Sequence, residues 1–221
     1  MPEEDGRLWQ IGEEIIGRLD SINSFRERAL AESRRVVRLS ANATRAVHRN
    51  EFDTAIELLD DARAMRDSLE NDLRDFPNLY WTGYVQDAQK EYAEARITLG
   101  IISRRGIPTP QDLNVEDAVF LNGLGEAAGE LRRYSLDSMR RHDLARASEL
   151  LSVMDEIYDL LVSVDYPDAV TGGLRRTTDM VRGVLERTRG DLTQALRQRE
   201  LTDALSHAED VLRVNQESSG S

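Results

Sequence analysis

The sequence predicts an all-α fold, a single-domain bundle of about six to seven helices. Apolar residues recur at the three- and four-residue spacing of helices, and no sustained two-residue alternation appears. The 14 glycines and 5 prolines gather at a few turns. With 221 residues the chain can bury a proper core, and it has neither an internal repeat nor a linker long enough to divide it. Helix-on-helix packing is then the only layer architecture available.

The first half of the chain predicts two long helices and a turn. The first helix runs from about residue 6 to 49, and the second from about 53 to 73. The first helix has the predicted core positions Ile15, Ile16, Leu19, Ile22, Leu30, Val37 and Val47. A turn follows at 75–78, with Asn78 as the N-cap of a third helix that ends near Gly106.

The second half predicts three more helices, the last of which is one long helix or a pair. A proline-containing loop at 107–114 precedes the fourth helix, which runs to about Arg141. The remaining boundaries are a fifth helix at about 144–164, a turn at 165–173, and a last helical segment from about 174 to 213. We expect one domain over 1–221, with a flexible tail from about 213.

The composition and motifs argue against several kinds of catalytic and binding site. There is no cysteine, and the three histidines have no zinc-site spacing. No phosphate-binding glycine loop and no serine nucleophile elbow occurs. No apolar run reaches the length of a membrane span and no signal peptide is visible, so we expect a soluble, cytoplasmic protein without a membrane partner.

The charge pattern resembles that of proteins from halophilic archaea. The net charge is −12, and Lys90 is the only lysine beside 28 arginines. Excess carboxylates keep a surface hydrated when salt screens charge. The negative charge therefore argues only weakly against a nucleic-acid partner, and local arginine clusters matter more.

Two acidic pairs on separate helices are the candidate metal ligands. Glu91 and Glu94 are three residues apart, and Glu126 and Glu130 are four apart, so each pair shares one helix face. The second pair lies in a nearly apolar stretch, where burying two like charges requires compensation. A metal ion or arginines could provide it, and the residues alone favour neither. Four converging carboxylates would form a site for a hard cation and phosphate chemistry.

The helix of the first pair has a clear core stripe, with the carboxylates beside it. We expect the buried positions to be Val85, Ala88, Tyr92, Ala95, Leu99 and Ile102. Glu91 and Glu94 then lie on the shoulder between core and solvent. Such a shoulder suits metal ligands, but it is also typical of an ordinary solvated helix flank.

Arginines cluster in three places, and arginine suits phosphate because its guanidinium is planar, permanently charged and bidentate. The candidate nucleic-acid-binding residues are Arg34, Arg38, Arg45, His48, Arg49, Arg132, Arg175 and Arg176. They predict surfaces for single-stranded nucleic acid. The alternative is ion pairing with the abundant carboxylates. Aromatic side chains at 76–84 could stack on bases, although packing at the start of a helix is the favoured interpretation.

Four segments together resemble the translin family, including its nuclease subunit, the translin-associated factor X. They are residues 39–49, 89–95, 121–132 and 167–182, and the acidic motifs are their most specific part. The resemblance implies a translin-like fold of about seven helices and a hollow octamer with catalytic sites facing its cavity. It also implies a divalent-metal-dependent endoribonuclease that cleaves single-stranded RNA.

The resemblance assigns the catalytic carboxylates to Glu91, Glu94, Glu126 and Glu130. Glu126 is a departure, because the nuclease subunit has aspartate there. We expect the four glutamates to hold Mg²⁺ or Mn²⁺, with Glu91 or Glu130 as an alternative general base. The competing hypothesis is a non-catalytic protein that binds single-stranded RNA or DNA. A third is a structural helical protein without a nucleic-acid role.

Overall fold

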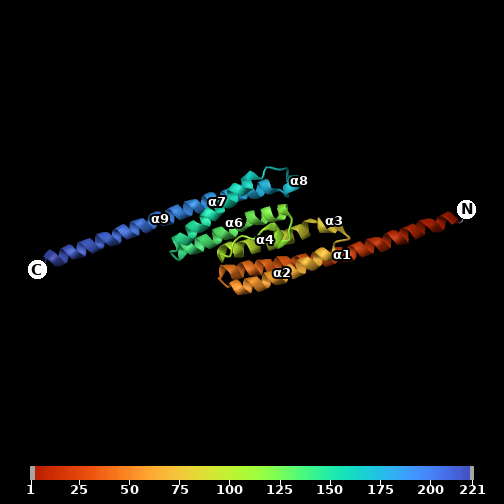
Figure 1. Cartoon of the computed structure of the whole chain (residues 1–221), viewed down its shortest axis with the longest axis horizontal. Helices are drawn as coiled ribbons and strands as arrows, with labels where there is room; N and C mark the ends of the chain where they lie inside the picture. Colours follow the sequence, from red (N-terminus) through yellow and green to blue (C-terminus); the bar gives the residue numbers. More distant parts are fainter. Residues whose placement is uncertain (1–2, 220–221) are drawn as a thin grey trace. The chain divides into compact units, whose positions relative to one another are not determined.

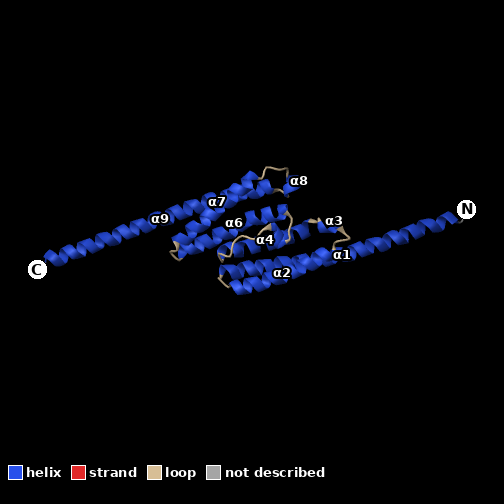
Figure 2. Cartoon of the chain, in the orientation of Figure 1, coloured by secondary structure: helices blue, strands red, loops and turns tan. Residues whose placement is uncertain are grey.

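The structure is a computed structural model that describes residues 3–219, with side chains described for 6–213 and 215. Its long helices are α1 (Glu3–His48), α2 (Phe52–Asp72), α4 (Gly83–Ile102), α6 (Asp117–Arg140), α7 (Leu144–Ser163) and α9 (Leu174–Ser219). The short helices are α3 (Pro77–Tyr80), α5 (Pro110–Leu113) and α8 (Asp168–Thr171). Residues 3–219 contain no strand (Figure 2). The all-α prediction is confirmed, with six long helices.

The contacts group the chain into two compact units. The first comprises Met1–Leu124 with Val170–Gly172, and the second comprises Gly125–Ala169 with Gly173–Ser221. The single domain over 1–221 stays a prediction.

The first unit is built on α1, which packs against both α2 and α4, while α2 also contacts α4 (Figure 1). The buried stripe of α1 consists of Ala29, Ser33, Val36, Ser40, Ala43 and Val47. Steps of four and three residues alternate along this stripe, which is the spacing of a coiled-coil seam. Its small side chains let the neighbouring helices approach closely.

The predicted core of α1 is wrong over its first half. Ile15, Ile16, Leu19 and Ile22 are 42%, 59%, 57% and 39% exposed. Burial on α1 begins only at Ala29, whereas the apolar face continues towards the N-terminus. Periodicity shows that a helix has an apolar face, but it does not show that the same chain covers that face.

The second unit pairs α7 with α9. Leu144, Ala147 and Leu192 form an apolar cluster there, and the Ser135 hydroxyl donates a 3.4 Å hydrogen bond to the Ala147 carbonyl. Gly125 on α6 allows a close approach, because a Cβ at this position would lie 2.3 Å from Thr177 Cγ2. This unit also exposes large apolar side chains along the second half of α9. They are Leu196, Leu201, Leu205, Val211 and Leu212.

Several element boundaries differ from the predictions. Asn78 is not an N-cap, because it lies inside α3, and Thr82 precedes the helix that holds the first acidic pair. The loop predicted at 107–114 contains α5, which begins with a capping box between Thr109 and Asp112. The turn at 165–173 contains α8, and α9 extends to Ser219 as one helix. None of the helices in residues 3–219 is long and apolar enough to cross a membrane.

Candidate metal and nucleic-acid site

Helix α4 holds the first acidic pair as the sequence predicts. Its core stripe of Val85, Ala88, Tyr92, Ala95, Leu99 and Ile102 is buried throughout. Glu91 and Glu94 lie beside this stripe and are half-buried. Their spacing of three residues places both carboxylates on one face of the helix.

The start of α6 lies directly against α4 at the level of this pair. A Cβ added to Gly123 would lie 3.1 Å from each of Ala93 Cβ, the Glu94 nitrogen and the Lys90 carbonyl oxygen. These contacts are tighter than most Cβ contacts, so glycine favours this close approach of the two helix backbones. Gly123 is not among the predicted site residues, although a glycine inside an apolar helix costs stability and is therefore a signal of close packing.

Asn122 fixes the start of α6 within the same unit. It is buried, and its Nδ2 donates 2.8 Å hydrogen bonds to the carbonyls of Ala118 and Thr171. A buried amide that satisfies carbonyls of two segments holds them together. The one uncharged polar residue of this apolar stretch therefore has a structural function.

Glu126 and Glu130 follow on the same uninterrupted helix. They are three and seven residues beyond Gly123, so all three lie along one stripe of α6. Both glutamates are half-buried. Glu91 and Glu94 belong to the first unit and this second pair to the other. The convergence of all four carboxylates therefore stays a prediction, supported by the close approach at Gly123.

The arginines beside the second pair have different partners. Arg132 Nη2 lies 2.8 Å from Asp191 Oδ2, and Arg132 Nη1 donates a 3.1 Å hydrogen bond to Thr188 Oγ1. Arg133 Nη1 is 3.9 Å from Glu130 Oε2, a long contact between adjacent turns. Arg132 thus ties α6 to α9, and its role in binding nucleic acid stays a prediction.

The predicted arginine stripe on α1 divides into partnered and unpartnered members. Arg49 donates 2.9 Å and 2.6 Å hydrogen bonds to the Glu51 carboxylate, which lower the pKa of Glu51, and Arg45 donates to Asn42 Oδ1. His48 is half-buried. Arg34 and Arg38 are exposed and make no hydrogen bond or ion pair with any residue that the structure describes.

Arg175 and Arg176 occupy the first turn of α9. Both are exposed, and neither has a hydrogen-bonding or ionic side-chain partner among residues 6–213. Cations at a helix N-terminus oppose the helix dipole and are unfavourable for stability. An anionic ligand would relieve this repulsion, because the N-terminal N–H groups and both guanidiniums attract phosphate.

The aromatic residues at 76–84 are mostly packing residues. Phe76 lies against Phe25 with ring centroids 4.4 Å apart, and Tyr80 and Tyr84 pack on the apolar cluster of the first unit. Trp81 is 60% exposed and contacts Tyr80 edge-on at 5.0 Å. Trp81 therefore remains the best placed of the four for stacking on a base.

Comparison with known proteins places the chain in a family. No family model matches. An uncharacterized protein of Methanocaldococcus jannaschii is 30% identical over 198 residues, covering 88% of this chain and 87% of that protein. A crystal structure of AfC3PO matches with a TM-score of 0.78 and 33% identity over 85% of this chain and 97% of that one. The chain belongs to the translin family.

Two further structures extend the comparison. AfC3PO in complex with duplex RNA matches with a TM-score of 0.79 and 32% identity, covering 85% of this chain and 97% of that chain. Apo-NeC3PO matches with a TM-score of 0.76 over 83% of this chain and 96% of that one, but its 19% identity shows likeness of fold alone. The translin-like fold predicted from the sequence is confirmed.

Proposed function

We propose that the protein is a divalent-metal-dependent endoribonuclease whose ligands are Glu91, Glu94, Glu126 and Glu130. The close approach of α6 to α4 at Gly123 supports the proposal most directly. It brings Gly123 of α6 against Lys90, Ala93 and Glu94 of α4, and Glu126 and Glu130 follow Gly123 on the same helix. Four half-buried carboxylates supply only oxygen ligands, which suits Mg²⁺ or Mn²⁺ rather than zinc.

The chain's own residues would hold the ion and orient the scissile phosphate. A bound ion would supply Lewis-acid polarisation of the phosphate and lower the pKa of an attacking water. Glu91 or Glu130 would accept the proton of that water, and the exposed guanidiniums would position the strand. Glutamate at 126 keeps the negative charge of an aspartate, but its extra methylene moves the oxygen and tunes the site.

RNA is the proposed substrate, held through Arg34, Arg38, Arg175 and Arg176. These four arginines are exposed and have no side-chain partner among residues 6–213, so they can pair with phosphates without breaking internal contacts. We propose single-stranded RNA as the cleaved form. The complex of AfC3PO with duplex RNA makes a duplex the necessary comparison substrate.

A homo-oligomer, and specifically an octamer, is the proposed assembly. The exposed apolar positions on the first half of α1 and the second half of α9 supply apolar surface that a subunit interface could bury. Size measurement by light scattering tests this assembly. A monomer at micromolar concentration would contradict it.

Cleavage of a 5′-labelled single-stranded RNA, with and without EDTA and at high salt, tests the proposed activity. We expect Glu91→Gln and Glu126→Gln to lower cleavage by at least about 100-fold while RNA binding is retained. Glu57→Gln is the matched control, because Glu57 is exposed on α2. Wild-type cleavage by either active-site variant, or cleavage unaffected by EDTA, would contradict the proposal.

The second candidate function is non-catalytic binding of single-stranded RNA or DNA. The contact of Arg133 with Glu130 favours it, because a carboxylate neutralised by arginine has less need of a metal. Binding of Mn²⁺ measured by electron paramagnetic resonance separates the two. No Mn²⁺ binding and no cleavage, together with retained RNA binding, would support the second candidate.

A further inference from the structure

A cleft of about 320 Å³ lies within the first unit, where α2, α4 and the segment 105–113 meet. From α4 it is lined by Tyr92, Arg96, Leu99 and Gly100. At about 100° per residue, these positions face roughly away from Glu91 and Glu94. The cleft is therefore separate from the proposed metal site.

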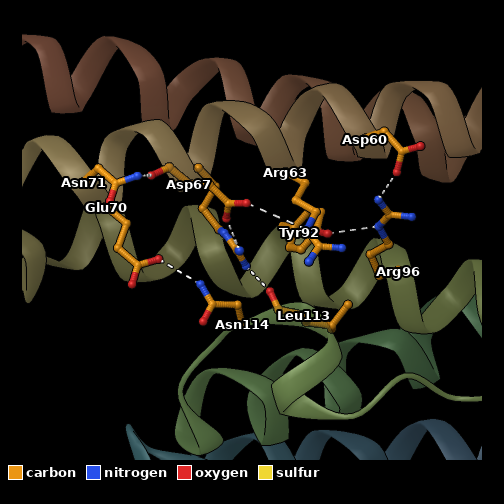
Figure 3. Close-up of polar contacts among 10 residues, drawn as sticks. Asp60, Arg63, Asp67, Glu70, Asn71, Tyr92, Arg96, Leu113 and Asn114 are labelled. Atoms are coloured by element: carbon orange, nitrogen blue, oxygen red, sulfur yellow. Dashed lines mark hydrogen bonds and ion pairs between the residues drawn. The ribbon is translucent and has the colours of Figure 1, made fainter.

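Tyr92 stands at this cleft between two guanidiniums. The Arg66 guanidinium lies 5.0 Å from the ring centroid and that of Arg96 lies 5.5 Å from it. Arg96 Nε donates a 3.1 Å hydrogen bond to the Tyr92 hydroxyl, and Arg96 also pairs with Asp60 (Figure 3). Tyr92 is fully buried, so it forms the fixed floor of the cleft and holds Arg96 in place.

Two more arginines line the cleft with weak internal contacts. Arg63 lies 3.8 Å from Asp67, and Arg105 lies 4.0 Å from Asp53, with about half of each arginine side chain exposed. Neither guanidinium donates a hydrogen bond to any residue that the structure describes. Both are therefore available to bind an anion, at the small cost of a long, solvent-screened ion pair.

The loop side of the cleft is fixed by local geometry. A Cβ on Gly100 would lie 2.1 Å from the Gly106 carbonyl oxygen, and Gly106 has φ +93°, so two glycines let the loop lie on α4. Asp112, the acidic residue of the lining, accepts hydrogen bonds from Thr109 N at 2.9 Å and Thr109 Oγ1 at 2.8 Å. These bonds lower the pKa of Asp112 and hold its carboxylate in the loop.

We propose that this cleft binds a nucleoside monophosphate. Arg63, Arg96 and Arg105 outnumber Asp112 in the lining, and Arg63 and Arg105 can exchange their long ion pairs with Asp67 and Asp53 for contacts with a phosphate dianion. Ile56, Leu99 and Leu113 provide an apolar wall for the base or sugar. A volume of about 320 Å³ is at the lower end for small-molecule sites and matches a mononucleotide rather than a longer strand.

Calorimetric titration of the full chain in EDTA, with adenosine 5′-monophosphate, adenosine and inorganic phosphate as separate probes, tests the proposal. We expect the monophosphate to bind at least about tenfold more tightly than either part, because both halves of the cleft contribute. Arg63→Ala combined with Arg105→Ala should weaken its binding at least about tenfold. Arg74→Ala, an exposed arginine of the same unit outside the cleft, is the control and should change nothing.

Absence of saturable binding up to about 10 mM would overturn the proposal, as would equal binding by the double variant and wild type with unchanged circular dichroism. Competition identifies the source of the ligand. Displacement by a 5′-phosphorylated oligoadenylate but not by its 5′-hydroxyl form indicates an RNA end, and displacement by neither indicates the free nucleotide. Glu91→Gln should leave this binding intact, so failure of the nuclease and failure of the cleft are distinguishable.

Discussion

Substitution of Gly123 tests the helix packing that supports the proposed metal site. In Gly123→Ala, the new methyl group would meet three atoms of α4 at 3.1 Å, two of them backbone atoms that cannot rotate away. Overpacking of this kind costs about 1–3 kcal/mol. Alanine is also the better helix former by about 1 kcal/mol, which offsets part of that cost.

Gly129 is the matched control because it lies on the same helix without this crowding. A Cβ on Gly129 meets no atom within 4 Å, so Gly129→Ala should gain the helix-propensity term alone. The propensity term then cancels between the two variants. Gly123→Ala should be less stable than Gly129→Ala by the overpacking cost, about 1–3 kcal/mol.

Thermal unfolding followed by circular dichroism at 222 nm measures this difference. For a chain of this size each kcal/mol corresponds to about 2–4 °C in Tm. Protein concentration and salt must be held constant, because assembly shifts Tm by mass action. If Gly123→Ala melts at or above the temperature of Gly129→Ala, the helices do not meet as described, and the main support for the four-carboxylate site is lost.

Three further predictions concern charged residues. Arg132→Ala should lower the free energy of unfolding by about 1–2 kcal/mol, because its contacts to α9 are lost, and Asp191→Asn should lower it by a smaller amount. Urea unfolding measures both variants, and an Arg132→Ala variant as stable as wild type would refute the prediction. Burial raises the pKa of Glu32, so its ionised form destabilises the fold as pH rises above the unfolded pKa of about 4.3. Glu32→Gln should therefore raise Tm near neutral pH and lose this advantage as pH falls to about 4. Combining Arg34→Ala with Arg38→Ala should reduce the salt dependence of single-stranded RNA binding by about 1.4 in logarithmic slope, and an unchanged slope would exclude phosphate contacts there.

The sequence predicts helices well because their signals are local. The long helices have the expected order, and the core stripe of α4 is buried at every predicted position. Boundaries were less accurate where a four-residue helix replaced a turn. Asparagine is a favoured N-cap residue, which is the basis of the prediction for Asn78. In the structure α3 already begins at Pro77, so Asn78 lies inside the helix.

The local sequence signals that predict helices do not predict which helix faces pack together. On α1 the large apolar residues Ile15 and Leu19 are exposed, whereas Ala29 and Ser33 are buried. Hydrophobicity ranks side chains by their gain on burial, but contact between helix backbones requires small ones. The close approach at Gly123 was also missed. A glycine inside an apolar helix indicates close packing, but it does not show which helix packs there.

The structure separates candidate arginines that have carboxylate partners from those that have none among the described residues, which the sequence cannot do. The chain has 41 acidic residues against 29 basic ones, so an arginine on its surface has carboxylates available nearly everywhere. Arg132 and Arg49 take such partners, whereas Arg175 and Arg176 have none among residues 6–213 and oppose the dipole of α9. Ion pairing accounts for the first two without a ligand. It does not account for Arg175 and Arg176. The proposed binding of phosphate at the helix N-terminus would account for them, because a phosphate would supply an anion to both guanidiniums and to the N-terminal N–H groups.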